Sequence, residues 1–248
     1  MSEHRDVVEG ALRPGSEIRA MFDRIVPRYD LMNRIMTGGR DVAWRRLAVR
    51  EALRDRVPKA TRVLDLATGT GDLAIALRDA GAGEVTGLDF SSQMLAAAAR
   101  KTADDGTRTS IAWIEGDAMA LPFPDESFDV VTIAFGLRNL PNYAEGIREM
   151  ARVLCTGGTL VCLETTPLTK PMLREVFTWG FANLLPRVAA LISGDEDAYS
   201  YLPASAAVFP DAVALGRMMQ DAGLRDVRFL RLGAGTVALH VARKPQAG

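Results

Sequence analysis

Short aliphatic and β-branched runs alternate along the chain with segments whose apolar positions recur every three to four residues. The short runs predict strands, because branched side chains fit the pleated surface of a sheet. The periodic segments predict amphipathic helices. The predicted strands are residues 62–66, 84–88, 110–114, 128–133 and 159–163, and the helices between them are residues 72–79, 91–103 and 142–154. This alternation predicts a doubly wound, mostly parallel α/β sheet.

The two ends of the chain depart from this alternation. Residues 16–53 have a helical pattern and precede the first strand, so we expect a lid whose apolar residues need a surface to pack on. Residues 211–222 predict a helix that Gly223 ends. Residues 227–232 and 236–242 predict an antiparallel pair that brings the sheet to seven strands. We expect a single domain over residues 1–248, with residues 165–210 as a helical insertion on the substrate side.

Composition and charge exclude several classes of protein. Hydrophobic residues make up 48% and charged residues 25%, which is ordinary for a globular chain. Thirty Lys and Arg against 31 Asp and Glu leave a net charge of −1, so we expect no nucleic-acid partner. No stretch approaches the ~20 apolar residues of a membrane span, and the first residues lack the apolar core of a signal peptide.

The two cysteines, Cys155 and Cys162, have no neighbouring histidine or second cysteine pair that would complete a metal site. We therefore expect reduced thiols, no metal and a cytoplasmic protein, with membrane contact limited to the periphery of the inner face.

A glycine turn follows the first predicted strand. Gly69 and Gly71 let a ligand approach the main chain where the amides of the next helix point outward. The spacing to Ala74 also fits a dinucleotide fingerprint, which keeps an NAD-dependent oxidoreductase open. Asp65 and Asp72 argue against that alternative, because two carboxylates at this turn would repel a pyrophosphate.

Acids also follow the next two predicted strands. Asp89 lies 18 residues after Gly71, where its carboxylate can accept hydrogen bonds from both hydroxyls of a ribose. Asp117 can accept from an adenine amine, and the Ala118 amide can donate to a ring nitrogen. One such acid is equally consistent with a helix cap or a solvated loop. Three in succession predict a cationic adenosyl ligand, S-adenosylmethionine.

Two phrases are more specific than the glycine turn: YDLMN at residues 29–33 and FGLRN at residues 135–139. With them the chain resembles, over nearly its whole length, the class I S-adenosylmethionine-dependent methyltransferases. More narrowly, it is similar to the quinone-biosynthesis C-methyltransferases, which methylate demethylmenaquinol or a polyprenyl-benzoquinol. The segments YSYLP at 199–203 and FP at 209–210 resemble the menaquinone branch, so demethylmenaquinol is the leading substrate and the benzoquinol is the alternative. The resemblance implies cofactor contacts for Thr70, Asp89, Asp117, Ala118 and Ala134.

The loop after the fourth predicted strand should face the transferred methyl group, because ligands of parallel sheets bind beyond the carboxyl ends of the strands. Carbon methylation needs a nucleophilic carbon, which a quinol provides beside an ionised hydroxyl. Arg138 cannot act as a base, but it can stabilise the phenolate or orient a water. In the alternative interpretation, Arg138 pairs with a surface acid and Asn139 caps the next helix.

Further candidates surround this centre. Tyr29 would place an aromatic face near the sulfonium, and Asp30 and Asn33 share its segment, although all three also fit an exposed helix face. Residues 177–192 form an apolar region that fits core packing, a homodimer face or a tunnel for a prenyl tail. In the last case, Arg187, Tyr201 and Phe209 would lie near its mouth. His240 is a candidate base, or else a packed strand residue.

Overall fold

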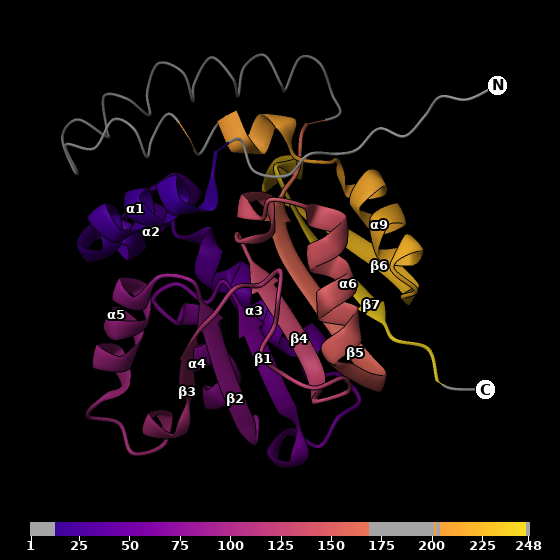
Figure 1. Ribbon diagram of the computed structural model, residues 1–248, viewed down its shortest axis with the longest axis horizontal. Coiled ribbons are helices and arrows are strands. Elements are labelled where there is room, and N and C mark those ends of the chain that lie inside the picture. Colours follow the sequence, from indigo (N-terminus) through magenta and orange to yellow (C-terminus); the bar gives the residue numbers. More distant parts are fainter. Residues whose placement is uncertain (1–12, 169–200, 202–203, 247–248) are drawn as a thin grey trace.

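The computed structural model describes residues 13–168, 201 and 204–246, which form a seven-stranded sheet flanked by helices (Figure 1). The strand order is β3-β2-β1-β4-β5-β7-β6. All pairs from β3 to β5 are parallel, and β7 runs antiparallel to both of its neighbours. The predicted doubly wound sheet is therefore confirmed. The strands are β1 Arg62–Leu66, β2 Glu84–Asp89, β3 Ala112–Glu115, β4 Phe128–Ala134, β5 Leu154–Thr165, β6 Arg225–Leu232 and β7 Val237–Arg243.

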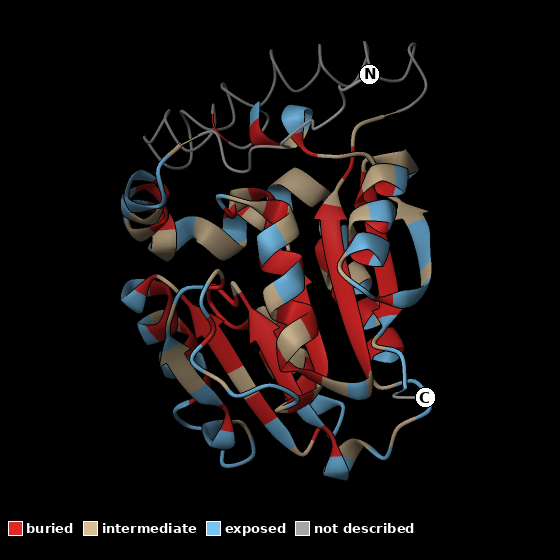
Figure 2. Cartoon of the chain, turned by 45° about the vertical axis from the view of Figure 1, so that its right-hand side comes forward, coloured by how far each residue is buried: buried red, intermediate tan, exposed pale blue. Residues whose placement is uncertain are grey.

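Helices cover both faces of the sheet, and the two-residue period of the strands divides the core between these faces. Leu64 belongs to the cluster under α6 and α9, whereas its neighbour Val63 belongs to the cluster under α3 and α4. Figure 2 shows the central strands buried and the outward helix faces exposed, whereas the edge strands β3 and β6 are intermediate or exposed. The α-helices are α1 Gly15–Ile25, α2 Tyr29–Thr37, α3 Arg40–Ala52, α4 Asp72–Asp79, α5 Ser92–Thr102, α6 Tyr143–Val153 and α9 Ala212–Asp221.

Among the described residues, short 3-10 turns occupy five connections: η1 Val26–Arg28, η2 Pro58–Ala60, η3 Arg108–Ser110, η4 Leu137–Asn139 and η5 Gly233–Gly235. Because η3 occupies Ser110, β3 begins later than the sequence predicts. In contrast, β5 begins at Leu154, earlier than predicted. The residues between Leu154 and Thr159 bulge opposite Asp129, and Gly157 supplies the positive φ of 74° within this bulge.

Side-chain caps fix the starts of three helices. Ser91 accepts a hydrogen bond from the backbone of Met94 at α5, which confirms the predicted cap. Asn142 accepts from the backbone of Glu145 at α6, and Asp211 caps α9. The helix after β4 is thus capped by Asn142, so the alternative that gave this task to Asn139 is wrong.

The N-terminal helices divide between two tasks. α1 and α2 lie across the upper ends of the left-hand strands, beside α5 (Figure 1). α3 instead packs Ala48, Val49 and Ala52 into the core on one face of the sheet, so it belongs to the helical layer. Of the expected insertion over residues 165–210, the structure describes 165–168, 201 and 204–210, with 204–208 helical. Residues 177–192, and Arg187 among them, lie outside the described residues. None of the described helices has the length and apolar character needed to cross a membrane.

Candidate active site

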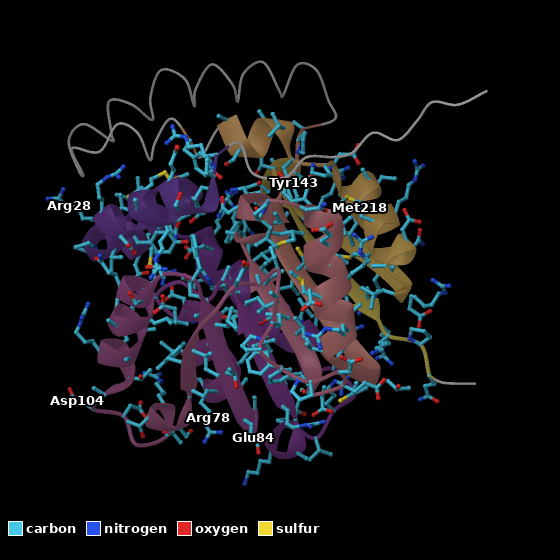
Figure 3. All side chains as sticks on the ribbon, viewed as in Figure 1. Arg28, Arg78, Glu84, Asp104, Tyr143 and Met218 are labelled. Carbon is cyan, nitrogen blue, oxygen red and sulfur yellow. The ribbon has the colours of Figure 1, made fainter. Side chains whose placement is uncertain are left out.

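A cavity of about 500 Å³ opens at the carboxyl ends of β1 to β4. It lies where the strand order reverses between β1 and β4, the usual ligand position in doubly wound sheets. Its volume is in the range of small-molecule sites. Figure 3 places Tyr143 toward this upper edge of the sheet and Glu84, at the start of β2, at the opposite edge.

Two residues that line the cavity have strained backbone. Ala67 follows β1 with φ of 48°, and Phe135 follows β4 with φ of 58°. A Cβ on Gly136 would lie 2.4 Å from the Cβ of Ala67, so only glycine permits this approach of the two loops. All three residues line the cavity. Backbone strain of this kind is typical of functional sites, where packing holds the chain in rare conformations.

Asp89 joins the end of β2 to the glycine turn. Its Oδ2 accepts from the backbone N–H of Gly69 at 2.8 Å, and its Oδ1 accepts from that of Ser91 at 2.9 Å. Burial raises the pKa of Asp89 to about 6, although these two hydrogen bonds oppose the shift. A carboxylate has about four acceptor positions, so Asp89 keeps capacity to accept from a ligand. Asp89 and Gly69 both line the cavity.

The charged side chains on the described cavity wall are three acids and one arginine: Asp89, Glu115, Asp117 and Arg19. Arg19 already pairs with Glu115 at 2.6 Å. The wall therefore carries excess negative charge and suits a cationic ligand better than a pyrophosphate. Ala118, which follows Asp117, also lines this end. Both charge and volume fit S-adenosylmethionine.

Other predicted cofactor residues lie behind the wall. Asp65 is 1% exposed and accepts hydrogen bonds from the hydroxyls of Thr68 and Thr132, each at 2.6 Å. Burial raises its pKa to about 6, against these hydrogen bonds. Asp65 thus stabilises the glycine turn through its hydrogen bond with Thr68. Gly71 is packed against Trp113, and Ala134 precedes the cavity residues Phe135 and Gly136.

Thr70 connects the turn to the N-terminal helices. Its hydroxyl donates to Asp30 Oδ1 at 2.6 Å and accepts from Lys101 Nζ at 2.9 Å. Lys101 also pairs with Asp30 and with Asp72. The structure thus brings together the predicted residues Thr70, Asp30 and Asp72. They form a polar cluster with Lys101 between α2, α4 and α5, and they do not line the cavity.

Tyr29 lies directly beside the glycine turn. One of its ring carbons lies 3.6 Å from the position that a Cβ on Gly69 would take. Burial raises the pKa of Tyr29, while a hydrogen bond with the Asn33 side chain lowers it. The structure therefore places Tyr29 and Asn33 together beside the predicted cofactor loop.

Arg138 lies in η4, on the loop that supplies Phe135, Gly136 and Asn139 to the cavity. It is 6% exposed, and its Nη1 donates to Glu164 Oε1 and to the carbonyl of Phe135, each at 2.7 Å. The proposed surface acid is thus a buried one, at the end of β5. Arg138 Nε is buried and has no hydrogen-bond partner among the described residues.

Asn139 and Tyr201 meet at the cavity. The hydroxyl of Tyr201 donates to Asn139 Oδ1 at 3.1 Å, so residue 201 is joined to the loop after β4. Phe209 instead packs edge-on against Tyr143 in the core. The structure thus brings Tyr201 to the site and leaves Phe209 behind it.

His240 lies away from the cavity, under α9. It is 1% exposed, and its Nε2 lies 2.8 Å from the carbonyl oxygen of Ala212. Burial lowers the pKa of His240, although this hydrogen bond opposes the shift. Its position favours the alternative of a packed strand residue.

Sequence reasoning missed three functional candidates. Arg19 and Phe22 of α1 line the cavity, and nothing local in their segment marks them. Glu164 follows the buried apolar run 160–163 near the end of β5, and an isolated acid there is the signal that could have drawn attention to it.

Comparison with known proteins identifies the family. The sequence model of the ubiE/COQ5 methyltransferase family matches residues 12–244. The chain belongs to this family. It is 48% identical to a demethylmenaquinone methyltransferase of Thermus thermophilus, over 91% of this chain and all of that protein. It is 44% identical to the enzyme of that name from Deinococcus radiodurans, over 98% and 99%.

Solved structures confirm the fold. The methyltransferase matches an S-adenosylmethionine-dependent methyltransferase from Thermotoga maritima with a TM-score of 0.61 at 19% identity, covering 92% of this chain and 99% of that one. A second such enzyme, from Aquifex aeolicus, matches with a TM-score of 0.54 at 18% identity, over 74% and 82%. The chain is an S-adenosylmethionine-dependent methyltransferase, as the sequence predicts, and the oxidoreductase alternative is set aside.

Proposed function

We propose that this methyltransferase methylates a ring carbon of demethylmenaquinol, a prenylated naphthoquinol, to form menaquinol. The observation that carries the proposal is the 48% and 44% identity, over nearly complete chains, to two proteins named demethylmenaquinone methyltransferase. The negatively charged cavity supports the donor half of the reaction, and the buried Arg138 beside it supports the acceptor half.

Asp89, Asp117, Ala118 and Gly69 would hold the methyl donor, with Tyr29 beside them. When bound, S-adenosylmethionine supplies an electrophilic methyl group. Asp89 would accept from the ribose hydroxyls, and Asp117 from the adenine amine. The aromatic face of Tyr29 would favour a sulfonium by about 1 kcal/mol.

Arg138 and Asn139 would act on the quinol. Ionisation of one hydroxyl makes the neighbouring ring carbon nucleophilic, and a guanidinium stabilises the resulting phenolate. Arg138 stays protonated, so the hydroxyl proton must leave through water. Arg138 would stabilise that oxygen through its positive charge, and Asn139 with Tyr201 would orient the ring.

The test is mass spectrometry of the product formed from demethylmenaquinol analogues and S-adenosylmethionine under reducing conditions. We expect a gain of one methyl group on a ring carbon, and no product from the oxidised quinone. Faster methylation of a polyprenyl-benzoquinol, or methylation on oxygen, would contradict the proposed substrate. The cytoplasmic location, peripheral membrane contact and a homodimer stay predictions, which vesicle flotation and light scattering can test.

A further inference from the structure

Glu164 is a buried acid outside the predicted site. It lies at the carboxyl end of β5 and is 1% exposed. Its Oε1 accepts from Arg138 Nη1 and from the backbone of Thr165, each at 2.7 Å, and from the Thr165 hydroxyl at 3.1 Å. Its Oε2 accepts from the backbone of Arg138 at 3.3 Å. Both oxygens are therefore engaged, and Thr165 orients the carboxylate independently of Arg138.

The same contacts hold Arg138 on one side only. Its Nη1 is shared between Glu164 and the carbonyl of Phe135, so this nitrogen ties the loop after β4 to the end of β5. Its Nε has no partner among the described residues. The anchored edge fixes where the guanidinium lies, and Nε is left as a buried donor without a partner among the described residues.

We propose that Glu164 is the positioning residue for Arg138, holding its guanidinium where it stabilises the ionised quinol. This inference rests on the proposed function. An arginine side chain has many rotamers, and catalysis by a fixed charge requires that the protein set its position before the substrate ionises. A buried carboxylate oriented by its own backbone neighbour provides that position.

Two substitutions separate the charge of Glu164 from its reach. Glu164→Gln keeps the shape but leaves the buried guanidinium without its counter-charge. Glu164→Asp keeps the charge but withdraws the carboxylate by one methylene from Arg138. Because misplacing a catalytic group by about 1 Å can cost roughly 100-fold in rate, both variants should lower kcat, by about 10-fold or more. We expect KM for the quinol, and the Kd for S-adenosylhomocysteine, to change by less than about threefold.

A double-mutant cycle with Arg138→Ala tests whether Glu164 acts through Arg138. If it does, Glu164→Gln should lower kcat in the parent and produce less than about a twofold further loss in the Arg138→Ala background. If the losses in kcat of the two single variants multiply in the double variant, the inference is wrong. An unchanged kcat in Glu164→Gln and Glu164→Asp, with a large loss in Arg138→Ala, would overturn it too while leaving the proposed function standing. If Arg138→Ala itself has no effect, it is the proposed role of Arg138 that fails.

A matched control and a binding readout keep this test sharp. Glu51 is another buried acid with two arginine partners, Arg54 and Arg228, but it lies outside the cavity wall, so Glu51→Gln should leave kcat unchanged. The absorbance of a bound naphthol analogue reports its pKa without turnover. In Glu164→Asp this pKa should move back toward that of the free naphthol, and an unshifted value would contradict the proposal. Should Glu164→Gln fail to fold, the cycle is run with Glu164→Asp.

Discussion

At the scale of single residues, the proposed donor site depends on how Asp89 is held. Its carboxylate is buried at the end of β2, where two backbone N–H groups fix its orientation. The cost of that burial is visible in a pKa raised to about 6. The carboxylate is thus mostly ionised at neutral pH, and mild acid is enough to protonate it.

We expect the affinity for S-adenosylhomocysteine to be full well above pH 6 and to fall as the pH drops through 6, because a protonated Asp89 accepts poorly from ribose hydroxyls. Asp89→Asn should weaken binding about 10- to 100-fold at pH 7.5, the effect of losing hydrogen bonds to a charged group. Calorimetry over pH 5–8 tests both statements. The variant should show no such pH dependence. A wild-type affinity that stays flat down to pH 5 would contradict this role, and Glu84→Gln, at the opposite end of β2, serves as the control (Figure 3).

At the scale of elements, α1 covers the end of the cavity that Glu115 lines. Arg19 reaches from α1 to Glu115 at the end of β3, and Asp23 accepts a hydrogen bond from the Ser91 hydroxyl at the start of α5. Phe22 of the same helix lines the cavity. A helix that precedes the sheet in sequence thus forms part of the wall, so we expect its contacts to slow the release of a ligand.

Arg19→Ala should increase the dissociation rate of S-adenosylhomocysteine about two- to fivefold. The expected change in rate is modest because the Arg19–Glu115 pair is partly exposed, and such ion pairs contribute about 0–1 kcal/mol. The increase should shrink at high salt. Stopped-flow displacement measures the rate. Arg148→Ala, which removes an exposed pair with Glu145 on α6, should have no effect, and a slower dissociation in Arg19→Ala would refute the closing role.

At the scale of the whole molecule, buried acids make stability depend on pH in two opposite ways. Asp65 and Asp41 are both 1% exposed. Burial raises the pKa of Asp65 to about 6. Burial acts the same way on Asp41, but the hydrogen bond from Arg34 and the charge of Arg45 outweigh it and lower the pKa below its usual 3.8. Asp65 therefore costs stability at neutral pH, and Asp41 contributes it.

The direction in which stability changes with pH follows from proton binding. The folded protein binds the Asp65 proton more tightly than the unfolded chain, so the cost is present above pH 6 and disappears as the pH falls to about 4. Asp65→Asn should raise the free energy of unfolding by about 1–3 kcal/mol at pH 7.5, with no difference near pH 4. Asp41→Asn should lower it at pH 7.5, with the loss fading below pH 4. Urea unfolding across this range measures both, and a destabilised Asp65→Asn at neutral pH would show that the Thr68 and Thr132 hydrogen bonds require the charge.

Some of the site could be predicted because its signals are local. Asp89 and Asp117 follow strands, and strands of a parallel sheet bring their carboxyl ends to one edge whatever else the chain does. The sequence places Thr70 in the glycine turn. Its contacts to Asp30 and Lys101 cannot be predicted locally, because these residues belong to helices distant in sequence. The alternative interpretation of Arg138 gives it a surface acid as partner, whereas its partner Glu164 is buried at the end of β5, 26 residues along the chain.

The sequence by itself determined the order of strands and helices, the glycine turn and the acids that favour a cationic ligand, because periodicity and charge are carried by neighbouring residues. Only the tertiary structure decided which of those residues face the cavity. Asp65 turns inward to Thr132, His240 lies under α9, and Arg19 and Glu164 reach the site from α1 and β5. These positions result from packing between segments far apart in the chain, which no local pattern records.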